Sequence, residues 1–256
     1  MTPAISLIVP AFNCETTLAR AVKSGLAQSC LREIIIVDDC STDKTYRLAL
    51  ELAENDPTIC VFQTQRNGGA GVARNLGASK ATGSHLCFLD SDDELIGDFF
   101  LEALSTLKAA PQILAIKSDQ LYFDPVIGNI LPTTDPRYTS AVLSSSVGMV
   151  LKREVFERIG GFPEDEAFRG PLGGEDVAFM QVLIKNFQPI ARLERPAYKV
   201  WCNTNSHVRK FLANTRLTEN GFEFISHHPD QQPDSALNRA LERYISADFR
   251  GPLTAE

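Results

Sequence analysis

Apolar runs that end abruptly in clustered aspartates limit the folds open to this chain more than any other feature. The run Leu86–Leu89 is followed by three aspartates within four positions, Asp90, Asp92 and Asp93. A short apolar run is typical of a buried strand. Carboxylates crowded at the exit of a strand repel one another, and a hard divalent cation bound by oxygen ligands would neutralise them. We therefore expect an acidic, cation-binding edge at the end of this strand.

A second apolar run, residues 33–37, ends in the same way at Asp38 and Asp39. Strands are predicted at 5–10, 33–37, 58–63 and 84–89, and they alternate with helices at about 15–28, from 43 to about 55, and through 73–78. This alternation predicts an α/β fold with a mostly parallel, Rossmann-like sheet flanked by helices. Ligands bind such sheets outside the carboxyl ends of the strands. The aspartates that follow the strands should gather on that edge.

The second half of the chain is less regular. Helices are expected at about 98–109, at 152–159 and from 175, with a strand at 113–117, a hairpin and loop over 119–138, and a return to the sheet over 144–151. The last ~50 residues are polar and are predicted to be helical in two pieces. We therefore expect one main domain over residues 1–210 and a small C-terminal helical extension over residues 211–256.

Composition excludes several classes of protein. The 256 residues carry a net charge of −7 and no long basic run, which argues against nucleic-acid binding. No apolar run approaches the ~20 residues that span a bilayer, and the N-terminus lacks the features of a signal peptide. We expect a cytoplasmic protein, with association at the inner face of the membrane left open. The six cysteines contain no C-x-x-C pair, so structural thiols are expected rather than zinc ligands.

Three local features have a functional and an ordinary interpretation. The Asp90-x-Asp92 pair could be a solvated loop, because aspartates often cap and turn after strands; the similar exit at Asp38 and Asp39 favours a metal-diphosphate site. The glycine-rich loop 68–74 lacks the third glycine of a dinucleotide fingerprint and follows the third strand. It is either a flexible neighbour of a nucleotide or a simple turn. His207 is either a surface histidine or a ligand for metal or phosphate.

The order and spacing of several motifs resemble the family 2 glycosyltransferases, which are inverting enzymes with the GT-A fold. The resemblance covers roughly residues 4–190. It rests on residues 6–13, on residues 33–39 with 41–43, on Gly71-Val72-Ala73-Arg74-Asn75, on residues 88–93 and 158–162, and on Glu175-Asp176. Each motif is modest alone, but the set in this order is specific.

The resemblance implies a role for each matching residue. Pro10, Phe12 and Asp39 would hold the nucleotide base, with Asp38 a weaker candidate, and Arg74 would approach the base or the diphosphate. Asp90, beside Ser91, would contact the ribose, and Asp92 would bind the Mn²⁺ or Mg²⁺ that bridges the diphosphate. His207 would correspond to a late metal-binding histidine. Asp176 would be the catalytic base, with Glu175 beside it.

The implied activity is metal-dependent transfer of a sugar from a nucleotide-diphosphate sugar to an acceptor hydroxyl with inversion. UDP is the expected carrier, and the acceptor could be a polysaccharide, a lipid-linked glycan or a small molecule. One base and one metal suffice for such a displacement. Two alternatives stay open. A nucleotidyltransferase would want a basic, glycine-rich loop after the first strand, which is missing after Pro10, and a non-catalytic nucleotide-sugar-binding protein would have no use for the Glu175-Asp176 pair.

Overall fold

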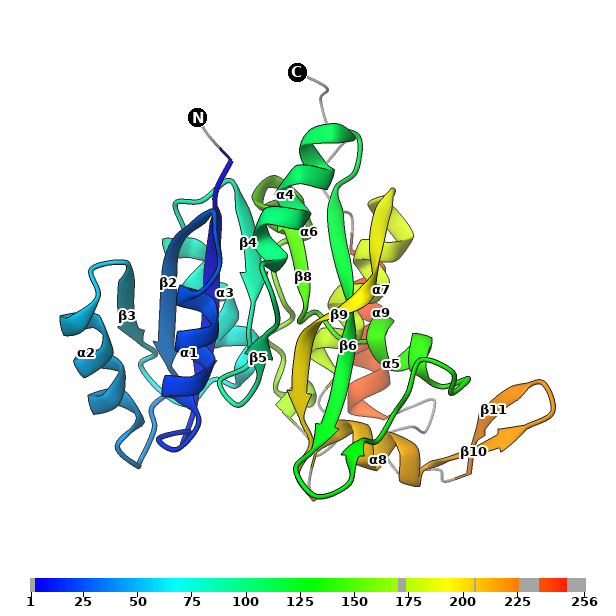
Figure 1. Ribbon diagram of the computed structural model, residues 1–256. Coiled ribbons are helices and arrows are strands. Elements are labelled where there is room, and N and C mark those ends of the chain that lie inside the picture. Colours follow the sequence, from blue (N-terminus) through cyan, green and yellow to red (C-terminus); the bar gives the residue numbers. More distant parts are fainter. Residues whose placement is uncertain (1–2, 170–173, 205, 226–234, 248–256) are drawn as a thin grey trace.

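The computed structural model describes residues 3–169, 174–204, 206–225 and 235–247, and Figure 1 shows a curved central sheet with helices on both faces. The strand order is β3-β2-β1-β4-β8-β6-β9-β5, with β7 paired to β6. The bounds are β1 Ile5–Ala11, β2 Leu31–Asp38, β3 Ile59–Gln63, β4 His85–Phe88, β5 Glu94–Leu95, β6 Ala115–Asp124, β7 Gly128–Asn129, β8 Met149–Lys152 and β9 Ile190–Trp201.

The first four long strands form the predicted parallel sheet. Strand β1 pairs in parallel with β2 on one side and β4 on the other, and β2 pairs in parallel with β3. Strand β6 pairs in parallel with β9, whereas β8 runs antiparallel to both of its neighbours, β4 and β6. The sheet is therefore mostly parallel with one reversed strand inside it.

Helices on the two faces cover two separate cores, because successive side chains of a strand point to opposite faces. Helices α1, α2 and α4 pack over Leu7 and Val9 on one face, and α3, α6 and α7 pack over Ile8 on the other. The helices are α1 Leu18–Leu26, α2 Thr45–Asn55, α3 Ala70–Lys80, α4 Phe99–Ala109, α5 Tyr138–Leu143, α6 Arg153–Ile159, α7 Glu175–Asn186, α8 His207–Ala213 and α9 Ala236–Ile245, with a 3-10 turn η1 at Glu166–Arg169. This layered α/β arrangement is the one the sequence predicts.

Several elements were not predicted, strand β9 and a C-terminal hairpin among them. Strand β9 carries charged residues such as Arg192, Glu194 and Lys199, so its periodicity does not resemble that of a buried strand. The C-terminal part contains helix α9 and also a hairpin of β10 (Thr215–Thr218) and β11 (Gly221–Phe224). Helix α9 packs on the main domain around Ala178 of α7. The division after residue 210 stays a proposal, and α8 runs across that position.

None of the helices in the described part of the chain combines the length and the apolar character that a bilayer crossing requires.

Gly77 sets the distance between helix α3 and the sheet. A Cβ atom at this position would lie 2.5 Å from Cγ2 of the buried Ile8 in β1. We expect Gly77→Ala to lower the free energy of unfolding by about 1–3 kcal/mol, although alanine has the higher helix propensity by ~1 kcal/mol. Urea denaturation would measure the change, with Ser79→Ala on the exposed side of the same helix as the control. Equal stabilities of the two variants would contradict the close contact.

Candidate active site

A cavity of about 960 Å³ opens where the chain leaves β3 and β4. Its walls come from segments far apart in the sequence. They are the glycine loop 67–72, the turn Asp90–Asp93, the segment Ser144–Val147 before β8, the first residues of α7, the end of β9, and parts of residues 203–214 with Phe224. Asp92 and Asp176 both face this cavity, as the clustering of acids at one sheet edge predicts.

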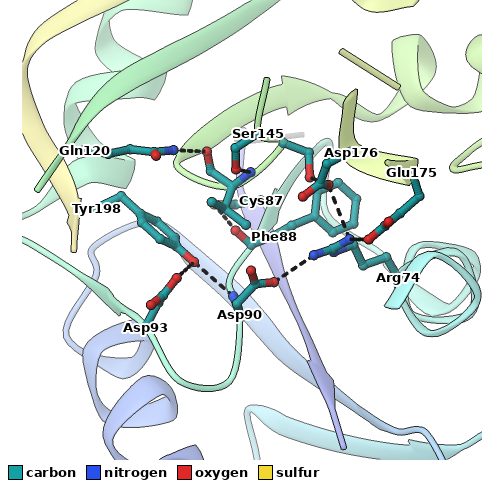
Figure 2. A network of polar contacts seen from close by, with 12 residues as sticks. Arg74, Cys87, Phe88, Asp90, Asp93, Gln120, Ser145, Glu175, Asp176 and Tyr198 are labelled. Carbon is teal, nitrogen blue, oxygen red and sulfur yellow. Dashed lines mark hydrogen bonds and ion pairs between the residues drawn. The ribbon is translucent and has the colours of Figure 1, made fainter. Parts of the chain in front are cut away.

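Arg74 lies at the centre of a network of carboxylates beside the cavity (Figure 2). Its guanidinium comes from α3 and is only 3% exposed, and Nη2 lies 2.8 Å from Oδ1 of Asp90. Nη1 lies 3.1 Å from Oε1 of Glu175 and 3.3 Å from Oδ1 of Asp176. Burial by itself would lower the pKa of Arg74, but the three carboxylates raise it above its ordinary value. One buried cation therefore joins the exit of β4 to the start of α7.

Asp176 is positioned from two sides. It stands in the first turn of α7, where the helix dipole favours an acid, and its Oδ1 also accepts a hydrogen bond from the Ser146 hydroxyl. Burial raises the pKa of its carboxyl and Glu175 adds to the rise, while Arg74, Ser146 and Lys117 oppose it. The side chain is still 24% exposed. This combination suits a group that must accept a proton from a molecule in the cavity.

The three aspartates after β4 have different surroundings. Asp93 is buried and accepts a hydrogen bond from the Tyr198 hydroxyl at 3.0 Å (Figure 2). It also accepts one from the Trp201 amide at 2.8 Å, so it ties this turn to β9. Burial raises its pKa well above the ordinary value. Asp92 faces the cavity, and desolvation there, together with the charge of Asp90, raises its pKa. A cation in the cavity would relieve this repulsion, so the carboxylate chemistry fits Mn²⁺ or Mg²⁺.

The predicted metal ligands do not form a complete cage. His207 is the exposed first residue of α8 and faces the same cavity as Asp92. Among the residues that the structure describes, no three His, Cys, Asp or Glu side chains come together closely enough to hold a metal ion. A metal here would need ligands from a bound molecule, as Mg²⁺ commonly takes from phosphates.

Asp38 and Asp39, which follow one another at the end of β2, bond different parts of the chain. The Asp39 carboxylate accepts hydrogen bonds from the amides of Gly68 and Gly69, at 2.9 and 2.7 Å for the shortest contact of each. Gly69 has a φ of +86°, a conformation that glycine adopts without strain. Asp38 is buried and accepts from the Gln63 amide and the Ser41 backbone, while its Oδ1 has no hydrogen-bond partner within the described chain. Asp39 thus supports the glycine loop, whereas Asp38 joins the end of β3 to the turn after β2.

The predicted nucleotide residues are only partly gathered around the cavity. Asp90 lines it. The described residues that line the cavity do not include Pro10, Phe12, Asp38, Asp39, Arg74 or Ser91. Phe12 is 48% exposed after β1, and Pro10 is buried in that strand. Their predicted contacts with a base remain a proposal about the ligand-bound protein.

Two residues near Asp176 were missed by the sequence analysis. Ser146 lies in an unremarkable serine run, and Lys117 closes the strand predicted at 113–117. Lys117 is buried, and its ammonium donates to the carbonyls of Ser145 at 2.8 Å and of Val147. Burial lowers the pKa of Lys117 to about 7. The only signal in the sequence is a lysine inside an otherwise apolar strand.

Comparison with known proteins identifies the family. The sequence profile described as Glycosyl transferase family 2 matches residues 6–159, which is more than half of the chain. The chain belongs to this family. The matched region includes Arg74, the acids after β2 and β4, and Ser146, and it ends before Glu175 and Asp176.

Several curated relatives match part of the chain at close to 40% identity. An uncharacterized glycosyltransferase of Haemophilus influenzae is 40% identical over 97 residues, which cover 38% of this chain and 39% of the relative. The succinoglycan biosynthesis protein ExoO of Rhizobium meliloti is 37% identical over 115 residues, covering 44% of this chain and 32% of that protein. The chain thus spans less than half the length of these relatives.

Solved structures share the fold over almost the whole chain. The S. aureus TarS 1–349 structure in complex with UDP-GlcNAc superposes with a TM-score of 0.67 at 20% identity, covering 94% of this chain and 70% of that one. The mannosyltransferase PcManGT from Pyrobaculum calidifontis, in complex with GDP-Man and Mn²⁺, gives 0.63 at 20% identity and covers 96% and 70%. These similarities show the GT-A fold for this chain.

Proposed function

We propose that this protein transfers a sugar from a nucleotide-diphosphate sugar to an acceptor hydroxyl with inversion, in the synthesis of a cell-surface polysaccharide. The observation that carries the proposal is the buried Arg74, which holds Asp90 from the exit of β4 and the Glu175-Asp176 pair from α7 on one cavity. Donor-side and acceptor-side acids therefore meet in one site. Names of relatives support the substrate classes: TarS is seen with UDP-GlcNAc, PcManGT with GDP-Man, and ExoO acts in succinoglycan biosynthesis.

In this proposal each side of the cavity has its own task. Asp176 takes the proton from the acceptor hydroxyl as that oxygen attacks the anomeric carbon, and Glu175 helps to hold Arg74 beside it. Asp90 contacts the ribose, and Pro10, Phe12, Asp38, Asp39 and Ser91 form the base side together with the glycine loop. Arg74 acts from behind the lining, where it fixes the positions of the acids.

Asp92 and His207 are the residues that would hold a divalent metal. The metal would supply Lewis-acid stabilisation of the negative charge that develops on the departing nucleoside diphosphate. A UDP-sugar is the first donor to test and a GDP-sugar the second. A growing glycan is the first acceptor to test, before a lipid-linked or small-molecule acceptor, and we place the protein in the cytoplasm at the inner membrane face.

Assays of donor binding and of sugar transfer would also test two other functions. A nucleotidyltransferase would release diphosphate from a nucleoside triphosphate, and a non-catalytic binding protein would bind the donor without hydrolysis or transfer. Asp176 lies beside the cavity, its side chain is partly buried and its pKa is raised, which favours transfer over binding alone.

Asp92→Asn is expected to weaken metal-dependent binding of the donor by about tenfold or more, because the variant keeps the shape of the side chain and removes a charge that would neutralise the cation. Isothermal calorimetry with UDP-sugars, with and without Mn²⁺, would measure the affinity. The control is Asp56→Asn after helix α2, whose carboxylate bonds only the neighbouring Thr58 in the described chain. Unchanged Mn²⁺-dependent affinity in Asp92→Asn would contradict the metal assignment.

A further inference from the structure

Side chains of strand β6 donate hydrogen bonds to the turn that precedes β8, residues 145–148. Lys117 donates to the carbonyl oxygens of Ser145 and Val147, the two residues that flank Ser146. Gln120 donates to the same Val147 carbonyl at 3.2 Å, and the Ser118 hydroxyl donates to the Gly148 carbonyl at 3.1 Å (Figure 2 shows the Gln120 contact). The turn is thus fixed through its carbonyl groups, which leaves the Ser146 hydroxyl free to face α7.

The Ser146 hydroxyl donates a hydrogen bond to Oδ1 of Asp176. The charge of Lys117 also stabilises the ionised form of this carboxylate and so opposes the rise in its pKa. The groups that face Lys117 are Asp176 from α7, the Cys87 thiol from β4 and Asp119 from β6. Asp176 in turn faces Arg74, Glu175, Ser146 and Lys117. Two cations therefore act on the Asp176 carboxylate, Arg74 from α3 and Lys117 from β6.

Burying the charged side chain of Lys117 costs free energy. The side chain is 1% exposed, and a buried ammonium is costly unless it is paired or fully hydrogen-bonded. Two carbonyls would be held as well by a neutral donor, and an apolar side chain of similar volume would often stabilise a core. A positive charge at this point is therefore explained better by what it does for Asp176 than by the stability of the turn.

We propose that Lys117 is a positioning residue for the transfer reaction: it holds the Ser145–Val147 turn so that Ser146 orients the Asp176 carboxylate toward the acceptor. This inference rests on the proposed role of Asp176 as the base. Lys117 itself does not contact the substrates. Because the pKa of Lys117 is about 7, its ammonium is protonated throughout the acidic range in which a carboxyl ordinarily titrates.

Lys117→Met keeps the length of the side chain and removes the charge and the hydrogen bonds. We expect kcat to fall about 10- to 100-fold because the base is no longer held in line, with the KM for the donor little changed. The acidic limb of the kcat profile should also move to higher pH, since the loss of a nearby cation raises the pKa of Asp176. The matched control is Lys152→Met, whose ammonium also donates to a backbone carbonyl, that of Pro111, but away from the cavity.

Ser146→Ala removes the hydrogen bond to Asp176 and leaves Lys117 in place. It should reproduce the fall in kcat, and the double variant should lose less than the sum of the two single effects, because both act through one carboxylate. Titration of the Asp176 carboxyl by ¹³C NMR, assigned with Asp176→Asn, reports on the same network without any assay of activity. A raised pKa in Lys117→Met supports the positioning role even if transfer by the wild type is not found.

An active wild type whose Lys117→Met variant keeps its kcat, its pH profile and the pKa of Asp176 would overturn the inference and leave the proposed function standing. So would additive effects of Lys117→Met and Ser146→Ala. Thermal unfolding of each variant would show that the comparison is made between folded proteins.

Discussion

Replacing Asp176 by asparagine is expected to lower kcat by about 10²- to 10⁴-fold, the range that general base catalysis contributes. Asparagine has the same shape but cannot accept the proton of the acceptor hydroxyl. Its amide can keep the hydrogen bond from Ser146 through the oxygen atom, so the start of α7 should remain folded. The affinity for the sugar nucleotide should change little, because the donor-side acids are untouched. Transfer assays for kcat and calorimetry for the donor would separate the two effects.

The pH dependence of the wild type provides a second measure of the same group. Burial raises the pKa of Asp176 above its ordinary value, and the carboxyl is a base only when it is deprotonated. Activity should therefore rise with pH along a limb that lies above the range of an exposed aspartate, and this limb should vanish in the residual activity of Asp176→Asn. Glu175→Gln, which removes a neighbouring charge that raises the pKa of Asp176, should keep the limb and move it to lower pH. Normal turnover by Asp176→Asn would exclude it as the base.

Replacing Arg74 by leucine is expected to lower the free energy of unfolding by about 3–5 kcal/mol, the usual cost of removing one partner from a buried ion pair. The guanidinium is the shared partner of Asp90, Glu175 and Asp176, so its loss leaves three acids close together without their cation. Urea denaturation at neutral pH would measure the change. Arg47→Leu is the matched control, because Arg47 pairs with Glu51 on the exposed surface of α2 and should contribute little.

The sign of the pH effect distinguishes repulsion from a simple packing defect. In Arg74→Leu the crowded carboxyls should have raised pKa values in the folded state, so the folded protein binds more protons than the unfolded one as the pH falls. Its stability relative to wild type should then recover toward acidic pH. A deficit that stays constant between neutral pH and the titration range of the acids would show that lost packing, and not charge, explains the result.

The sequence predicts the part of this fold that depends on local periodicity. The runs that form β1, β2 and β4 are short and apolar, and the residues after them are polar, so strands and exits can both be recognised. Strand β9 could not be found in this way, because it mixes charged side chains such as Arg192 and Lys199 with apolar ones. Arg192 reaches Asp119 on β6, and Lys199 lies over the ring of Trp201. Such a strand is stabilised by partners that only the folded chain supplies.

Some residues of the candidate site can likewise be found from local motifs, whereas others are brought there only by the fold. Asp92 and Asp176 were proposed from motifs, and the structure brings both to one cavity. The partners of Arg74 could not be predicted, because its contacts with Glu175 and Asp176 span about a hundred positions of sequence. Lys117 and Ser146 belong to no motif, and their position beside Asp176 follows only from the pairing of β8 with β6.

The reversed direction of β8 has a consequence for how such a site can diversify. Because β8 runs against β4 and β6, the connection that enters it arrives at the same rim where its neighbours end. Under the proposed function, changes in residues 125–143 could therefore alter which acceptor fits against Asp176, while the Ser145–Val147 turn and the β1–β4 half, which would hold the donor, stay as they are. In that case one reversed strand would allow the choice of acceptor to change without a change on the donor side.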